Sequence, residues 1–277
     1  MPLAGGGVGW IAVQFQPKSG LHQHGLIGDD LDAGRAGIAL FLAGLARVTG
    51  EERWRKLALS AFHPAGGAPD ARGRFYALAG ISRLLAAPEM LAQAHLCEDG
   101  PSAWGVLDGQ AGLLLALLAL HAEAGDRNCR SPLHARAVAC GERLLAGADG
   151  WQPPSGGLGG FSHGAAGIGY ALARLYTVCR EARFLAGARR AWDFQRTLYE
   201  EQAGNWQDLR GATPVFLHNW CNGAAGIGLA AAGCLDVLPE LADVVERAGA
   251  LLVSGDGPLR GVALLVYLAA LPDKATR

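Results

Sequence analysis

The 277-residue sequence has almost no net charge, because 24 Lys and Arg residues stand against 25 Asp and Glu residues. A protein without an overall basic field has no general attraction for nucleic acid or an anionic membrane surface, so neither is expected as its partner. Long apolar runs are also missing. The longest, residues 111–120, is too short to span a bilayer, and no basic start followed by an apolar stretch marks the N-terminus. We therefore expect a soluble, cytoplasmic protein.

Paired cysteine motifs are absent as well. None of the six cysteines belongs to a CxxC pair, and six are too few for a disulfide framework in a chain of this length. This cysteine usage fits a reducing compartment. Hydrophobic residues, in contrast, make up 51% of the chain, which is enough for one large core. A single domain over residues 1–277 is the expectation.

A phrase of small residues recurs ahead of apolar segments along the chain. It is found around Gly34, Gly109, Gly164 and Gly223, with a weaker copy near Gly73. Small residues followed by an apolar run indicate a turn that leads into a tightly packed helix. Residues 10–15 differ, because they alternate like a short strand before turn-forming residues. Residues 1–27 are therefore expected to form a small N-terminal flap.

Segments rich in Ala, Leu and Arg lie between the glycine-led segments, at residues 51–61, 133–146, 183–198 and 241–252. They show the pattern of amphipathic helices. A helix that is apolar all round must be buried, whereas an amphipathic helix can cover it, so the helices should sort into an inner and an outer layer. The pattern predicts an all-α fold. If the repeats close on themselves it is an α/α toroid, with every inner helix beginning at the same mouth.

This convergence would bring together Asp32, Asp108, His163 and Cys221. Each has a plain structural alternative: the two aspartates could cap helices, His163 could be a core histidine, and Cys221 could be a buried thiol. At a helix start, however, the positive end of the helix dipole favours a thiolate. Cys221 would then be suited to metal ligation or nucleophilic attack.

Three stretches carry a resemblance to a known family. Residues 162–169, 204–210 and 220–228 are similar to the cyclase domain of lanthionine synthetases, especially the C-terminal half of the bifunctional class II enzymes. Residues 29–42 resemble the opening of that domain, and the similarity runs from about Trp10 to the C-terminus without a dehydratase half. The resemblance implies an α/α toroid that adds peptide cysteine thiols to dehydroalanine or dehydrobutyrine. A modified precursor peptide is the implied substrate, and a separate dehydratase the implied partner.

The resemblance also implies a zinc site, which this chain has only in degenerate form. In the family, two cysteines and a histidine hold a zinc ion that activates the incoming thiol. Cys221 matches the first zinc cysteine, and His163 matches the active-site histidine. Val253 and Ser254 stand where the family has its second cysteine and its zinc histidine.

Two of the three expected ligands are thus replaced. A rebuilt site would combine Cys221 with two of His218, Asp256 and His163. Lanthionine synthetases with kinase-like partners have cyclase domains that also lack the full ligand set, so loss of zinc does not by itself remove the activity. Two further departures are Gly105, where an aspartate is usual, and Asn222, where class II relatives commonly carry histidine.

Two other functions remain open from the residues. The toroid mouth could bind a leader or modified peptide as a non-catalytic scaffold while another enzyme performs the chemistry. Alternatively, the acidic run at residues 29–32 could serve a cyclase of an apolar, terpenoid substrate, with tryptophan faces stabilising a carbocation. The candidate aromatic residues are Trp104, Trp151, Trp206 and Trp220.

Overall fold

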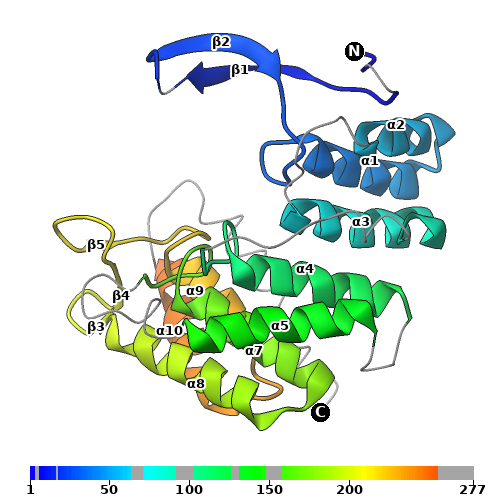
Figure 1. Ribbon diagram of the computed structural model, residues 1–277. Helices are drawn as coiled ribbons and strands as arrows, with labels where there is room; N and C mark the ends of the chain where they lie inside the picture. Colours follow the sequence, from blue (N-terminus) through cyan, green and yellow to red (C-terminus); the bar gives the residue numbers. More distant parts are fainter. Residues whose placement is uncertain are drawn as a thin grey trace. The chain divides into compact units, whose positions relative to one another are not determined.

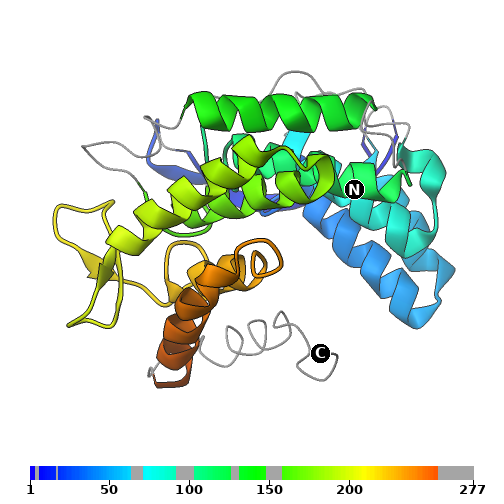
Figure 2. The same ribbon diagram turned by 90° about the horizontal axis from the view of Figure 1, so that it is seen from below.

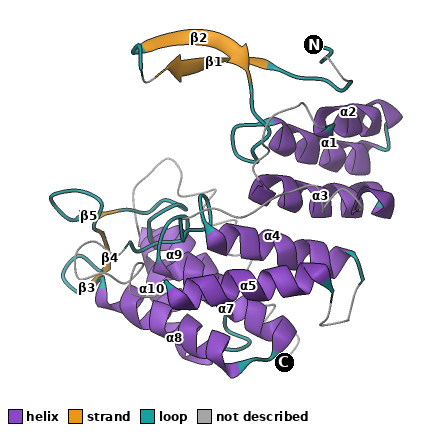
Figure 3. Cartoon of the chain, in the orientation of Figure 1, coloured by secondary structure: helices purple, strands orange, loops and turns teal. Residues whose placement is uncertain are grey.

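The computed structural model describes residues 1–3, 6–16, 18–63, 71–91, 103–125, 131–147 and 158–254. Most of these residues are helical, and the strands belong to two small sheets (Figure 3). The chain divides into two compact units, described here one at a time. The first comprises Met1–Asp99 and Ala116–Leu133, and the second Gly100–Leu115 and His134–Arg277.

Three helices of the first unit form a packed group (Figure 1). The glycine-led helix α1 (Arg35–Thr49) begins directly after Gly34 and packs against the amphipathic helix α2 (Glu52–Phe62) and against α3 (Ala71–Leu85). Its buried face consists mostly of alanines, whereas Phe41 on the opposite face is 69% exposed. The glycine-led helix α1 is therefore less completely buried than its apolar sequence predicts.

The N-terminal residues form a hairpin. Strand β1 (Ile11–Gln16) pairs antiparallel with β2 (Leu21–Leu26), with Ile11 opposite Leu26. The first strand lies where the alternating pattern predicts one, and the hairpin falls inside the expected flap at residues 1–27. The expectation of an all-α fold is therefore confirmed only in its main part, since the described residues are mostly helical with small sheets added.

The second unit repeats the pairing of a glycine-led helix with an amphipathic one. Helix α7 packs against α8, α9 packs against α10, and the two glycine-led helices α7 and α9 also pack against each other. Nearly all of α9 is buried, whereas α8 buries one face that includes Phe184 and Trp192. The helices are α4 (Gln110–Glu123), of which residues 110–115 belong to this unit, α5 (Pro132–Ala146), α7 (Ala165–Cys179), α8 (Ala182–Thr197), α9 (Ala224–Ala232), the short 3₁₀ turn η2 (Pro239–Leu241) and α10 (Ala242–Ser254).

These helices match the predicted segments closely. The amphipathic patterns at 51–61, 133–146, 183–198 and 241–252 become α2, α5, α8 and α10, with small shifts at their ends. The glycine-led patterns become α1, α4, α7 and α9. No helix in the described ranges is long and apolar enough to cross a membrane. Closure of the repeats into a toroid stays a prediction.

A second small sheet follows α8. Its order is β3 (Tyr199–Glu200), β4 (Asn205–Asp208) and β5 (Val215–Phe216), all antiparallel, with Asp208 opposite Val215. In both views this sheet lies at one end of α8 (Figures 1 and 2). The sequence did not predict it, because strands of two to four residues are too short to show alternation. The chain runs from this sheet into the loop that carries Cys221.

Candidate functional site

The glycine-led helices of the second unit begin with one common loop geometry. The first N–H of each helix has no acceptor within the helix, and a carbonyl of the preceding loop supplies one. In α9 this N–H is therefore bound to Leu217 and is not free to face the Cys221 thiol. The pairs are Gln110 N to Ala103 O at 2.9 Å, Ala165 N to Leu158 O at 2.8 Å, and Ala224 N to Leu217 O at 3.1 Å, with Arg35 N to Gly28 O at 2.8 Å in the first unit.

The third residue of each helix must be a glycine, because the loop folds back onto it. A Cβ atom at Gly226 would lie 1.9 Å from the carbonyl oxygen of Trp220, and one at Gly167 would lie 2.0 Å from that of Phe161. No side chain fits at such distances. Gly112 and Gly37 are crowded in the same way by Val106 and Leu31. Each loop is thus fixed against the first turn of its own helix.

Neighbouring loops are also joined to one another. The N–H groups of Val106 and Leu107 both donate to the carbonyl of Ser162, at 2.8 and 2.9 Å. The N–H groups of Phe161 and Ser162 donate in turn to the carbonyl of Cys221, at 3.1 and 2.8 Å. The loops before α4, α7 and α9 therefore lie side by side, held by main-chain bonds that do not depend on side-chain identity.

His163 and Asp108 meet at the first of these junctions. The Nδ1 atom of His163 lies 3.3 Å from Oδ2 of Asp108, and the two side chains are 28% and 54% exposed. This contact assigns the proton of the neutral ring to Nδ1, which donates to the carboxylate. Nε2 is then the nitrogen that can exchange a proton with a ligand. A ring with this exposure and this partner is not a core histidine. The Asp108 carboxylate, which stands just ahead of α4, is thus also paired with the imidazole.

Cys221 lies on the adjoining loop as a half-buried free thiol. Its carbonyl accepts the N–H of Ser162, the residue before His163, so the structure brings the loops of Asp108, His163 and Cys221 together as predicted. The catalytic roles of the three residues stay predictions. Asp32 is exposed and belongs to the loop before α1 in the first unit, so its approach to the other three also stays a prediction.

Three of the residues that favour a terpenoid cyclase, Asp29, Asp30 and Trp206, have other structural partners. Asp29 forms an ion pair with the buried guanidinium group of Arg35, and Oδ1 of Asp30 accepts the N–H of Ala33 at 2.7 Å. Both carboxylates thereby hold the loop before α1. Trp206 is 2% exposed and packs edge-on against Tyr199, and Trp151 lies outside the described residues.

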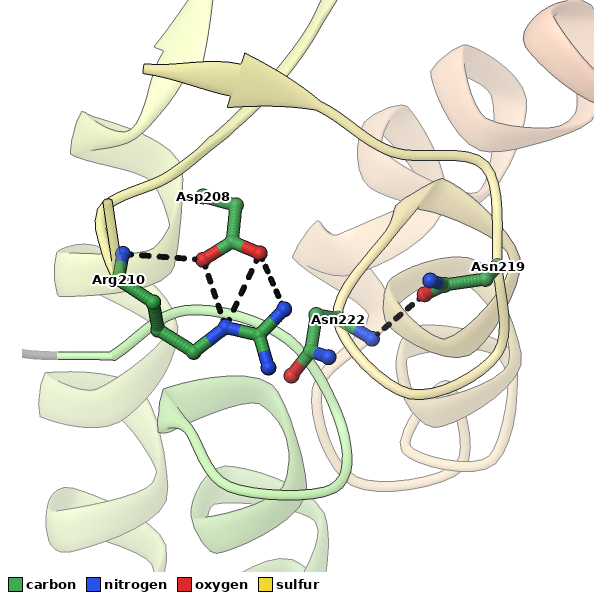
Figure 4. Close-up of polar contacts among 4 residues, drawn as sticks. All are labelled: Asp208, Arg210, Asn219 and Asn222. Atoms are coloured by element: carbon green, nitrogen blue, oxygen red, sulfur yellow. Dashed lines mark hydrogen bonds and ion pairs between the residues drawn. The ribbon is translucent and has the colours of Figure 1, made fainter. Parts of the chain in front are cut away.

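An ion pair that the sequence did not predict lies beside the Cys221 loop. Arg210 donates from Nε to Oδ1 and Oδ2 of Asp208, at 3.0 and 3.1 Å, and from Nη2 to Oδ2 (Figure 4). The main-chain N–H of Arg210 adds a bond to Oδ1 at 3.1 Å. These bonds hold the pKa of the Asp208 carboxyl below its usual range, although its burial acts in the opposite direction. Asp208 is 7% exposed, so the carboxylate is the buried end of the pair.

Asn222 connects this pair to the Cys221 loop. Its N–H donates to Oδ1 of Asn219 at 2.9 Å, which fixes the turn, and its side chain lies beside the Arg210 guanidinium group (Figure 4). With the amide oxygen turned toward the guanidinium, that oxygen accepts from Nη1 at 3.0 Å and Nη2 at 2.9 Å. The opposite orientation would set donors against donors. The pKa of Arg210 is raised chiefly by its hydrogen bond to the Asp208 side chain, although partial burial acts in the opposite direction.

A signal for this pair existed in the sequence. Asp208 and Arg210 are two positions apart, so at the end of a strand they share one face. The spacing becomes informative only once β4 is recognised.

A comparison with protein families identifies the family of the chain. A sequence model of lanthionine synthetase C-like proteins matches residues 26–252. The chain belongs to the lanthionine synthetase C-like family. A search of curated proteins returned no match. Membership in a family of thioether-forming cyclases implies a peptide substrate.

Lanthionine synthetase C-like enzymes are typically zinc-dependent. A zinc ion needs several His, Cys, Asp or Glu side chains close together. Within the described ranges, no group of three or more His, Cys, Asp or Glu side chains could hold a metal ion. Cys221, His163 and His218 therefore do not form a rebuilt zinc site by themselves. Asp256 and the side chains of residues 252–254 lie outside the described part, and the family match ends at residue 252. The described residues do not fit a zinc ion.

Proposed function

We propose that this protein is a thioether-forming cyclase, which adds cysteine thiols of a peptide to dehydroalanine or dehydrobutyrine residues. The observation that carries the proposal is the contact of His163 with Asp108, at 3.3 Å, on a loop whose main chain is bonded to that of Cys221. A partly exposed imidazole held by a carboxylate can act as a general base and then as a general acid. Family membership supplies the peptide substrate class.

The reaction needs one proton to be moved and nothing to be oxidised or reduced. His163 takes the proton of the peptide thiol, and the thiolate sulfur then forms a bond to Cβ of the dehydro residue. The electron pair of the carbon–carbon double bond moves toward the carbonyl group, which gives an enolate. The imidazolium returns the proton to Cα, and Asp108 stabilises the charged ring in between. The sum is the addition of S–H across the double bond.

Incubation of the protein with a dehydrated precursor peptide tests the proposal. Ring closure leaves the peptide mass unchanged, so the readout is the number of thiols that N-ethylmaleimide still alkylates, with fragment spectra to locate the rings. We expect each ring to remove one alkylation. As a control, the same dehydrated peptide is incubated with an enzyme known to cyclise it. If the peptide loses thiols with the control enzyme but keeps all of them with this protein, the proposal is contradicted.

A peptide-binding scaffold is the second candidate. Val253 and Ser254 at two family ligand positions favour it, because those side chains cannot hold zinc as Cys and His do. A scaffold would bind the dehydrated peptide, as measured by calorimetry, and leave every thiol free. The same incubation thus separates the two functions.

A further inference from the structure

The ion pair of Asp208 and Arg210 is an oriented dipole beside the proposed site. Its negative end is buried, with Asp208 7% exposed, and its positive end is open, with the Arg210 side chain 43% exposed. An ion pair contributes little field at long range, since its charges cancel. At hydrogen-bonding distance, however, the open guanidinium edge is a strong donor.

The guanidinium group is held in one orientation and is not fully used. Arginine has five N–H donors in a planar fork. Nε and one Nη2 hydrogen point to Asp208, and the second Nη2 hydrogen and one Nη1 hydrogen point to the Asn222 amide oxygen. One Nη1 hydrogen remains without a partner among the described residues. Asp208, whose bonds to the guanidinium group are drawn in Figure 4, and Asn222 together fix the plane of the fork before any ligand arrives.

The guanidinium group of Arg210 meets the loop that carries Cys221 through the side chain of Asn222. Asn222 follows Cys221 directly, and it occupies the loop position that His163 holds before α7 and Asp108 before α4. The Asn222 amide oxygen accepts from both Nη atoms of Arg210, at 2.9 and 3.0 Å. Arg210 therefore contacts, in the loop before α9, the position that His163 occupies in the loop before α7. Arg210 itself belongs to the sheet segment that follows α8.

We propose that Arg210 binds a negatively charged oxygen of a ligand located at Cys221, with Asp208 and Asn222 as the residues that position it. The identity of this oxygen rests on the proposed function. It is the carbonyl oxygen of the dehydro residue, which becomes a negatively charged enolate oxygen when the S–Cβ bond forms. Arg210 donates a hydrogen bond to that oxygen while His163 returns the proton to Cα. A carboxylate on the peptide has the same chemistry and would use the same donor.

The test uses two alkylating reagents on Cys221 and requires no cyclase activity. Iodoacetate carries a carboxylate and iodoacetamide is neutral, and both react with the same thiolate. The ratio of their rates at Cys221, followed by peptide mass spectrometry, is therefore independent of how much thiolate is present. We expect an anion-binding Arg210 to favour iodoacetate, and we expect the double variant D208N/R210Q to lower the ratio about two- to fivefold, the size of a half-exposed ionic interaction.

The double variant is chosen because it removes one charge of each sign, so the net charge of the protein is unchanged and no buried carboxylate is left alone. The matched control is D243N/R196Q, which removes an ion pair of 2.9 Å between α8 and α10 without changing the net charge. The control should keep the wild-type ratio. An unchanged ratio in D208N/R210Q, with a wild-type circular dichroism spectrum, would overturn the proposal.

A second arm separates the two sources of the oxygen and stands apart from the proposed function. If wild-type protein closes rings, R210K should lower kcat when the ligand is the enolate oxygen, and should raise KM when it is a peptide carboxylate. If wild-type protein closes no rings, the proposed function fails while the iodoacetate ratio still decides the anion site.

Discussion

His163 is the residue on which the proposed chemistry depends most directly. Substitution His163→Asn keeps the size and polarity of the side chain but removes the group that exchanges a proton. We expect ring formation to fall by about 10²–10⁴-fold, as is typical when a general acid–base group is lost. Thiol alkylation of the peptide over time measures the rate. Because the ring is 28% exposed, the melting temperature should change little, and a large drop in stability would assign the residue a structural role instead.

Asp208 gives a prediction about acid stability. Its native pKa is lowered by Arg210, so the folded state favours the ionised carboxylate. This contribution is fully present above the unfolded pKa of about 3.9 and is lost as the pH falls through the lower native value. We expect Asp208→Asn to cost about 1–2 kcal/mol near neutral pH and progressively less below about pH 4.

Urea unfolding across the acid range measures this difference. Asp243→Asn is the control, because Asp243 is about half exposed in its ion pair with Arg196 and should cost little at any pH. A cost of Asp208→Asn that stays constant down to low pH would show that the carboxylate charge is not its source.

The described cysteines should differ strongly in reactivity. Cys140 and Cys234 are buried, and burial raises the pKa of both thiols, that of Cys234 to about 12. Burial also raises the pKa of the half-buried Cys179 thiol. Cys221 is half-buried beside a guanidinium group, so we expect iodoacetamide to label it before the other three. Site-resolved mass spectrometry gives the order, and equal labelling of Cys221 and Cys234 would contradict this account.

At the scale of single elements, the glycines of the helix starts can be tested against a glycine that has space. A Cβ at Gly226 would lie 1.9 Å from the Trp220 oxygen, whereas a Cβ at Gly44, inside α1, would meet nothing within 4 Å. We expect Gly226→Ala to destabilise the protein by more than about 2 kcal/mol, because backbone must move. Gly44→Ala should instead stabilise it by up to about 1 kcal/mol. Opposite signs in thermal unfolding are the expected result.

The helices could be predicted from sequence because their signals are local and repeated. Gly34, Gly109, Gly164 and Gly223 mark the starts of α1, α4, α7 and α9, and a repeated phrase strengthens each single instance. The weaker copy is an exception, because Gly73 is the third residue of α3, the position that Gly226 has in α9, and does not precede the helix.

The candidate site could be predicted only where it shares this repeat. His163, Asp108 and Cys221 stand at related positions of the repeated phrase, so overlaying the copies predicted that they would meet. Arg210 has no counterpart in the phrase, and it reaches the Cys221 loop only through a short sheet whose strands carry no periodic signal. Its hydrogen bonds to Asp208 and Asn222 depend on side-chain geometry, and the spacing of Asp208 and Arg210 becomes informative only once β4 is recognised.

For the whole molecule, α4 links the two compact units. Residues 110–115 of this helix belong to the second unit and residues 116–123 to the first, yet the helix is continuous from Gln110 to Glu123. Helix formation is cooperative, since each residue added to an existing helix needs no new nucleus. Loss of either unit would therefore remove the tertiary contacts that stabilise half of a shared helix. Folding of residues 1–277 as a single domain stays a prediction.

Two leucines of α4 test that prediction. Leu114 lies in the second unit and Leu117 in the first, and both are fully buried. Either substitution by alanine should cost about 2–5 kcal/mol, the usual loss for a buried leucine. If the units fold as one domain, calorimetry shows a single unfolding transition, and Leu114→Ala and Leu117→Ala each lower its midpoint temperature. Circular dichroism then gives the same midpoint for each variant. Two transitions, with each variant shifting only the one that belongs to its own unit, would show that the chain folds as two domains joined by a helix.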